Sequence, residues 1–206
     1  MYLEEEFFTS LTKDLFLSIT KIKLICKDCH YTSHNFSQSQ NISINPLHNK
    51  SISQLLTSDL SGDVTKFCTI CKCDKLHEET ISVEQRPKVL TILVNRFDSS
   101  TLGRKNNTSI IIDQVIEFHG YNYKLLSIID HHGCHTSSGH YTCCLFFSKC
   151  NYLCNDSVVK EIDFIKYSTS AYILFYSLIN WLVWYCYFSR PHIHRVVFKY
   201  ELLTPQ

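Results

Sequence analysis

The sequence is short of glycine and proline and has no surplus of charge. Only 5 glycines and 4 prolines occur in 206 residues, and we find neither an internal repeat nor a low-complexity segment. A formal net charge of +1 argues against the basic patches with which proteins bind nucleic acid, so nucleic acid is not an expected partner. The 45% of hydrophobic residues is enough for one good-sized core.

The N-terminus also lacks the features of a secretory leader. Its first eight residues include three glutamates where a signal peptide has basic residues, and no long apolar stretch follows them. We therefore expect a cytoplasmic or nuclear protein. In those compartments eleven cysteines, an odd number, are expected to be thiols and metal ligands rather than disulfides.

Residues 167–189 form the one long stretch without a charged side chain. It has about the length of a membrane span. If residues 171–176 form a core strand, however, only residues 177–189 remain, which is too short to cross a bilayer, and we expect no membrane contact. The role of the tail 177–206, apolar and then basic, stays open. It could be a partner-binding amphipathic element, a membrane-surface segment or sequence from an altered reading of the gene's end.

The pattern of apolar residues predicts a mostly β domain with small helices. Residues 17–24 alternate between apolar and polar, which predicts a strand, and residues 31–44 predict a further strand pair with polar turns. Residues 80–97 are strand-like on both sides of a proline. Apolar residues at helical spacing behind a serine predict a short helix at 51–56.

Four cysteines are arranged as two Cys-x-x-Cys pairs. The pairs are Cys26 with Cys29 and Cys68 with Cys71. Each pair can place two thiolates on a tight knuckle around one tetrahedral zinc ion. His30 and Cys73 lie close enough in the sequence to compete as ligands. The alternative is a set of free, buried cysteines in a cysteine-rich chain; the pairing favours a structural zinc ion.

Residues 140–159 are predicted to form a hairpin that holds a base and the group that orients it. Residues 140–147 and 152–159 are strand-like, with polar turn residues between them. Antiparallel pairing would bring Asn155 within a residue or two of the position opposite His140. A histidine that accepts a thiol proton and an asparagine that orients its ring are two thirds of a Cys-His-Asn triad. The alternative is that His140 is an ordinary strand histidine.

Four blocks in the expected order resemble the ubiquitin-specific proteases. They are residues 86–97 ending in Arg-Phe, the histidine box within 123–142, the Asn-Asp pair at 155–156, and residues 171–176. The resemblance implies a papain-like α+β fold, mostly β with short helices. It also implies thiol-dependent hydrolysis of (iso)peptide bonds at the C-terminal glycine of ubiquitin. In this family's scheme His140 is the general base. Asn155 orients it, assisted by Asp156, and Gly139 and Tyr141 contact ubiquitin.

The resemblance further implies how the chain is organised. Residues 1–176 would be part of the catalytic domain, with the zinc ribbon of the fingers at about 17–85 and the palm with the histidine box at about 86–176. Paired Cys-x-x-Cys knuckles sit in this family at the tips of fingers that grip ubiquitin. We therefore expect zinc as a structural cofactor, and ubiquitin and ubiquitinated proteins as partners.

The nucleophile of the expected triad is missing from the printed sequence. The family's box, in which a cysteine follows Asn-Thr, does not occur in the 206 residues. Four cysteines are assigned to metal. Five others lie in or beside the hairpin and are expected not to reach His140 from the nucleophile's side: Cys134, Cys143, Cys144, Cys150 and Cys154. The chain is thus expected to be a fragment of a cysteine-type deubiquitinase, inactive alone. The alternatives are a non-catalytic ubiquitin-binding zinc module and a zinc-stabilised scaffold that does not contact ubiquitin.

Overall fold

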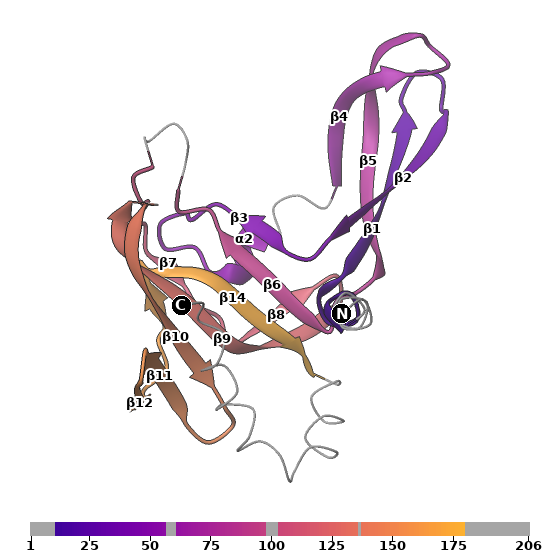
Figure 1. The fold of residues 1–206 in the computed structure, drawn as a ribbon. Coiled ribbons are helices and arrows are strands. Elements are labelled where there is room, and N and C mark those ends of the chain that lie inside the picture. Colours follow the sequence, from indigo (N-terminus) through magenta and orange to yellow (C-terminus); the bar gives the residue numbers. More distant parts are fainter. Residues whose placement is uncertain (1–10, 57–60, 98–102, 136, 180–206) are drawn as a thin grey trace, which may run out of the picture.

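The computed structural model describes residues 11–56, 61–97, 103–135 and 137–179. Most of these residues lie in β-strands, with only short helical segments (Figure 1), which confirms the predicted fold class. Within the described ranges, no helix has the length and apolar character needed to span a membrane. The predicted tail 177–206 lies outside these ranges from residue 180 onward.

A four-stranded antiparallel sheet in the order β2-β1-β5-β4 projects from the rest of the molecule as an arm (Figure 1). Its strands are β1 Ser18–Cys26, β2 Thr32–Ser39, β4 Ser61–Cys68 and β5 Cys73–Gln85. β1 confirms the strand predicted at 17–24. Two tight turns, one between β1 and β2 and one between β4 and β5, meet at the tip of the arm and carry the four paired cysteines.

The remaining strands form a larger eight-stranded sheet in the order β12-β11-β10-β9-β14-β6-β3, with β8 also paired to β9. Its strands are β3 Ile42–Ile44, β6 Val89–Val94, β8 Val115–Phe118, β9 Tyr121–His135, β10 Ser138–Phe146, β11 Asn151–Asn155, β12 Val158–Ile162 and β14 Ala171–Leu178. The strands β7 Ile110–Ile111 and β13 Tyr167–Ser168 form a separate pair. This sheet provides the platform on which the hairpin lies.

One prediction about pairing was wrong. Residues 31–44 were expected to form a strand pair, but β2 pairs with β1 in the arm, whereas β3 runs parallel to β6 in the large sheet. Burial explains the difference. The side chains of β2 are almost all exposed, while Ile44 of β3 is buried in the core of the large sheet. The chain therefore crosses from one sheet to the other between the two strands.

The short helix α2, Ile52–Leu56, confirms the prediction for residues 51–56. Its first turn is capped reciprocally: the Gln54 N–H donates to Ser51 Oγ at 3.3 Å, and the Ser51 N–H donates to Gln54 Oε1 at 3.2 Å. Such a capping box satisfies two N–H groups that a helix start leaves unpaired. Ile52, the first residue of the helix, is fully buried in the core.

Three neighbouring strands, β6, β14 and β9, lie at the centre of the core of the large sheet. Its fully buried side chains include Leu90 and Ile92 of β6, Leu125 and Ile128 of β9, and Leu174 of β14. Two buried tyrosines belong to the same core. Tyr123 donates to the Pro87 carbonyl at 2.9 Å, and Tyr176 donates to the Asp113 carbonyl at 2.8 Å. Both hydroxyls are therefore satisfied inside an apolar core.

The end of β6 is fixed by Arg96, which is completely buried. Its guanidinium donates to four backbone carbonyls: Ala171 at 2.6 Å, Asn106 and Thr108 at 2.9 Å, and Ser168 at 3.2 Å. Burial lowers the Arg96 pKa to about 10, an effect that the nearby Asp130 carboxylate opposes. Arg96 thus ties β6 to the start of β14 and to the loop at 106–108.

Candidate active site and metal centre

The hairpin of β10 and β11 brings the predicted base and its orienter together. The two strands pair from Cys143 opposite Cys154 to Phe146 opposite Asn151. The same register, continued, places Asn155 two residues from the position opposite His140. In the structure His140 Nε2 lies 2.6 Å from Asn155 Oδ1. The predicted proximity is therefore present as a direct side-chain hydrogen bond.

This hydrogen bond determines which nitrogen of His140 can act as a base. The carbonyl oxygen of an asparagine side chain only accepts hydrogen bonds, so Nε2 must carry the proton. The neutral ring then has its lone pair at Nδ1. That nitrogen is the one left to take a proton from a nucleophile, which is the arrangement that a Cys-His-Asn triad needs.

The second strand of the predicted hairpin is shorter than expected. Residues 152–159 were predicted to be one extended strand, but the chain turns directly after Asn155, and β12 folds back on β11. Asp156 is in that turn, with a left-handed φ of 49° and an exposed side chain. An aspartate tolerates this backbone conformation better than most residues. The turn therefore positions Asp156 beside the site, at the end of the strand that carries Asn155.

An open hollow of about 470 Å³ lies in front of this pair. It is lined by residues of β9, β10 and β11 and by Ile165, Tyr167, Ser168, Thr169 and Ser170. His132 also lines it and was not predicted: its Nε2 lies 2.8 Å from Thr142 Oγ1, and its ring stacks on His140 with centroids 6.4 Å apart. His132 is opposite His140 in the sheet register. The pairing of β9 with β10, rather than a sequence motif, brings it into the site.

Cys144 lines the same hollow but is buried and engaged elsewhere. Its thiol donates to Asp130 Oδ2 at 3.7 Å, and Ser170 Oγ donates to Asp130 Oδ1 at 2.8 Å. Burial and the Asp130 carboxylate raise the Cys144 pKa to about 12. Cys144 is therefore a neutral thiol at physiological pH and a weak nucleophile.

Gly139 is required by a close approach of the His131 ring. A Cβ atom at Gly139 would lie 2.8 Å from His131 Cε1 and from the His132 carbonyl oxygen, and nearer still to His131 Nε2. His131 cannot easily move away because it is buried, with Phe97, Tyr141 and Tyr172 packed edge-on or tilted against it. Burial also lowers the His131 pKa. The sequence analysis missed His131, which sets the path of the backbone immediately before His140.

The other predicted ubiquitin contact, Tyr141, is accessible. Its ring is in edge contact with His131 at a centroid distance of 4.9 Å, and the residue is 53% exposed. Neighbouring residues of a strand point to opposite faces. Tyr141 therefore lies on the opposite face of β10 from His140.

We predict that Gly139→Ala destabilises the protein by about 1–3 kcal/mol, the usual cost of overpacking a filled site. Either His131 or the backbone before His140 must shift to admit the methyl group. Urea unfolding measures the effect. Gly62→Ala is the matched control, because a Cβ at Gly62 meets nothing within 4 Å. Equal midpoints for the two variants would contradict the account of Gly139.

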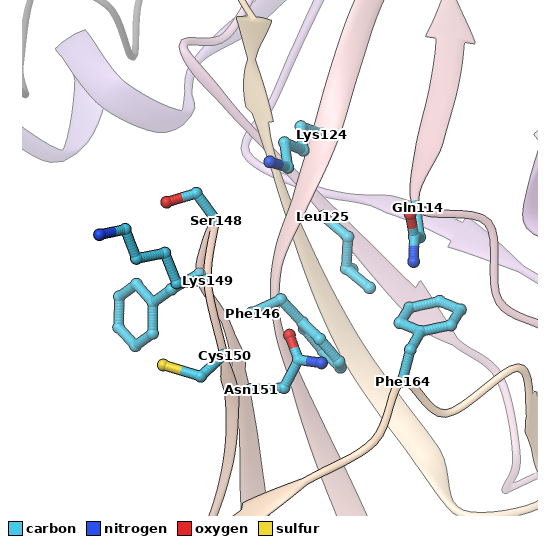
Figure 2. Close-up of a pocket in the computed structure, with 10 residues that line it drawn as sticks. Gln114, Lys124, Leu125, Phe146, Ser148, Lys149, Cys150, Asn151 and Phe164 are labelled. Atoms are coloured by element: carbon cyan, nitrogen blue, oxygen red, sulfur yellow. The ribbon is translucent and has the colours of Figure 1, made fainter.

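A second hollow, of about 250 Å³, lies beside the turn between β10 and β11. Figure 2 shows the amides of Gln114 and Asn151 and the rings of Phe146 and Phe164 around it. No residue of the predicted site lines this hollow. It lies at the opposite end of the hairpin from His140 and is separate from the candidate active site.

The four paired cysteines meet at the tip of the arm. The sulfurs of Cys26, Cys29, Cys68 and Cys71 all lie within 4.8 Å of one another, with 3.5 Å between Cys29 and Cys68 and 4.0 Å between Cys26 and Cys71. A tetrahedron with Zn–S bonds of about 2.3 Å has edges of about 3.8 Å. The cluster includes neither His30 nor Cys73, the two possible competitors.

The two knuckles have the same backbone geometry. In each, the N–H that follows the second cysteine donates to the carbonyl of the first cysteine at 2.9 Å. The donors, His30 and Lys72, both have a left-handed φ of 58°. Backbone N–H groups also face the sulfurs: the Cys71 N–H donates to Cys68 Sγ at 3.5 Å, and this contact is the main cause that lowers the Cys68 pKa to about 7.

The sulfurs cannot all ionise without a cation. The pKa of Cys71 is raised, first by its hydrogen bond with Cys29 and then by burial. A thiolate is the form that binds a metal. A closed set of four such ligands at tetrahedral spacing fits a structural zinc site, and it has no open position of the kind that a catalytic metal needs. The donor chemistry and the spacing therefore both suit the predicted ion.

Comparisons with known proteins point to one family. The family model described as ubiquitin carboxyl-terminal hydrolase matches residues 3–176. Among curated proteins, mouse ubiquitin carboxyl-terminal hydrolase 17-like protein E is 26% identical over 184 residues, and rat ubiquitin carboxyl-terminal hydrolase 2 is 30% identical over 203 residues. The alignments cover 82% and 87% of this chain but 34% and 32% of the relatives. The chain therefore spans about a third of their length.

The fold is similar to that of a solved deubiquitinase module. A chain in the SAGA DUB module of Ubp8, Sgf11, Sus1 and Sgf73 bound to monoubiquitin superposes with a TM-score of 0.69 at 21% identity. The match covers 82% of this chain and 42% of that one. With the family model matched over most of its length, the chain belongs to the ubiquitin carboxyl-terminal hydrolase family, as its resemblance to the ubiquitin-specific proteases predicted.

Proposed function

We propose that this chain supplies the general base and its orienting residue to thiol-dependent hydrolysis of (iso)peptide bonds at the C-terminal glycine of ubiquitin. The observation that carries the proposal is the 2.6 Å contact between His140 Nε2 and Asn155 Oδ1, in a chain that belongs to the hydrolase family. Asn155 holds the ring and its tautomer. His140 Nδ1 accepts the proton of a cysteine thiol as the sulfur attacks the scissile carbonyl, and it later returns that proton to the leaving amine.

Asp156 has a supporting role in this proposal. The turn after β11 places it next to Asn155, where its carboxylate favours the imidazolium that forms at His140 during the reaction. Because the Asp156 side chain is exposed, water and salt screen this effect. Asn155, which contacts the ring directly, therefore carries most of the orienting function.

We further propose that the attacking thiol is not one of this chain's described cysteines. The Cys144 pKa of about 12 and the Cys143 pKa of about 11, both raised chiefly by burial, keep these thiols neutral. Four other cysteines form the arm cluster. Among the rest, Cys150 donates its thiol hydrogen to Tyr152 Oη at 3.0 Å in the hairpin turn. Three described cysteines are left: Cys73 lies in the arm, and Cys134 and Cys154, on β9 and β11, are expected not to reach His140 from the nucleophile's side. Cys186 lies outside the described residues.

Zinc and ubiquitin complete the proposal. Cys26, Cys29, Cys68 and Cys71 would hold zinc as a structural ion that cross-links the two turns at the tip of the arm. The arm would then be rigid enough to contact the body of ubiquitin, while Gly139 and Tyr141 contact its C-terminal tail. The similar SAGA DUB module is bound to monoubiquitin, which supports ubiquitin as the partner. A cytoplasmic or nuclear location remains our expectation.

The proposal is tested with a fluorogenic ubiquitin C-terminal amide as substrate. We expect the zinc-loaded 206-residue chain to show no turnover above the background, because the base has no thiol to deprotonate. Turnover that is abolished by a thiol-alkylating reagent would contradict the assignment and would place the nucleophile among this chain's own cysteines. A full-length relative of the chain serves as the positive control for substrate quality.

In a longer form that carries the nucleophilic cysteine, we predict that His140→Ala lowers kcat/KM by about 10²–10⁴-fold, the usual contribution of a general base. Zinc content should not change, because His140 is far along the chain from the arm cysteines. His48→Ala, an exposed histidine in a loop, is the matched control and should keep full activity. Unchanged turnover in the His140 variant would remove this residue from the mechanism.

A further inference from the structure

Two cysteines lie directly opposite each other on the hairpin that carries the candidate site. Cys143 of β10 pairs in register with Cys154 of β11. Directly paired residues of an antiparallel sheet point to the same face and have Cα atoms about 4.5–5.5 Å apart. A disulfide needs a Cα separation of about 4.4–6.8 Å. The register alone therefore gives the two residues the Cα separation that a disulfide needs.

The surroundings leave this pair accessible from one side. Both cysteines are half-buried. In the sheet register Cys143 also pairs with Ile129 of β9, and Cys154 pairs with Val159 of β12. Val159 is 57% exposed, so the row of four residues is open at its β12 end. A small reagent can therefore approach Cys154 from the exposed edge of the sheet.

The other cysteines of the hairpin do not fit such a bond. Cys144 points to the opposite face, is buried and donates its thiol hydrogen to Asp130. Cys150 is in the turn, four residues before Cys154, and its thiol contacts Tyr152 Oη. Cys143 makes only a long contact, 3.9 Å, with the Cys144 carbonyl oxygen. The geometry thus singles out one pair.

We propose that Cys143 and Cys154 form a redox modification site, which a small disulfide such as oxidised glutathione converts to a cross-strand disulfide. The Cys154 thiolate attacks one sulfur of the reagent, forms a mixed disulfide and releases one glutathione thiolate. Cys143 is mostly a neutral thiol, because burial raises its pKa. The small fraction that loses its proton attacks the Cys154 sulfur and releases the second glutathione. Each protein thiol loses its proton to water. Two protein thiols are oxidised, and one molecule of glutathione disulfide is reduced to two thiols.

The position of this bond gives it a consequence for the site. Cys154 directly precedes Asn155, and Cys143 is three residues after His140 on the facing strand. A covalent link there fixes the register of the two strands that hold the base and its orienter. This consequence rests on the proposed function. The bond itself does not, so a failure of one can be told from a failure of the other.

The test treats the zinc-loaded full chain with oxidised glutathione, then blocks the remaining thiols by alkylation, digests with trypsin and maps the products by mass spectrometry. Trypsin cuts after Lys149, so the disulfide would join two separate peptides. We expect a linked species that has lost two hydrogens, with fragment ions that assign the bond to Cys143 and Cys154. Glutathione adducts at the exposed Cys73 and Cys134 show that the reagent has acted.

Two variants test whether Cys154 is the cysteine that bonds to Cys143. Cys150→Ser should leave the link intact, whereas Cys154→Ser should abolish it and leave Cys143 alkylated or glutathionylated. The proposal is overturned if Cys143 and Cys154 are both alkylated while Cys73 and Cys134 carry glutathione. It is equally overturned if the bond joins Cys143 to Cys150 as readily as to Cys154. Should the Cys154 variant fail to fold, the map of the unaltered chain decides alone.

Discussion

Removal of zinc is expected to unfold the tip of the arm, that is, the parts of β1, β2, β4 and β5 within residues 23–75, while the large sheet, with β3, stays folded. The arm has little apolar core of its own. Among its described residues, β2 is almost entirely exposed, and the fully buried hydrophobic residues near the tip are two of the metal ligands themselves, Cys26 and Cys68. Binding of a structural zinc ion is worth about 10–16 kcal/mol at neutral pH. No other interaction at the tip approaches that magnitude.

Besides the backbone hydrogen bonds of the paired strands, the contacts at the tip include two ion pairs at the surface. Lys27 pairs with Asp63 and Lys75 pairs with Asp28, both at 2.5 Å, and all four side chains are about one third to one half exposed. Exposed pairs of this kind contribute about 0–1 kcal/mol each. Ion pairs of this strength cannot replace the cross-link that a zinc ion forms between the two turns.

Hydrogen exchange measured with and without a strong chelator tests this expectation. Amides of β1, β2, β4 and β5 within residues 23–75 should lose protection on chelation, and those of β3, β9, β10 and β14 should keep it. Cys26→Ser should reproduce the effect without chelator, while Cys134→Ser, at an exposed cysteine outside the cluster, should not. Protection in the arm that does not respond to chelation would contradict the zinc assignment.

Replacement of Arg96 is the second change with a large expected effect. Arg96→Met should lower the free energy of unfolding by about 3–5 kcal/mol, because four backbone carbonyls lose their donor and the buried Asp130 loses a compensating charge. Arg96→Lys should recover only part of the loss. An ammonium group has three donors and cannot reproduce the planar fork of the guanidinium.

Urea unfolding at neutral pH gives the comparison. Lys160→Met, which removes a positive charge from an exposed position of the edge strand β12, is the control and should change stability by no more than about 0.5 kcal/mol. Because Arg96 connects β6 to β14, the variant should also weaken the platform under the hairpin. A loss below about 1 kcal/mol would show that water replaces the guanidinium at these carbonyls.

Local sequence signals were enough to predict several elements. The alternation at 17–24 predicted β1, the serine before apolar residues at helical spacing predicted α2, and the Cys-x-x-Cys spacing predicted the four-sulfur cluster. Each of these signals depends on residues that are close in the chain. The contact between His140 and Asn155 was also predictable, because a short turn fixes the register of a hairpin.

The features that were missed depend on pairing between distant segments. Nothing local in residues 42–44 indicates a parallel partner in β6, and His131 and His132 enter the site only because β9 pairs with β10. The early end of β11 was missed for a different reason. Asn155 and Asp156 are turn-forming residues, so a signal was present, but the extended pattern on both sides of them favoured one long strand.

We propose that this chain contacts ubiquitin through Gly139 and Tyr141, beside the candidate base His140. The most direct measurement is a titration of ¹⁵N-labelled ubiquitin with the zinc-loaded 206-residue chain, followed by NMR. We predict that the resonances of ubiquitin's C-terminal tail shift progressively, and that they shift less with the Gly139→Ala variant, in which the backbone beside His140 is displaced. Tail resonances that do not move at any concentration would contradict the claim and would leave a zinc-stabilised β scaffold that does not contact ubiquitin.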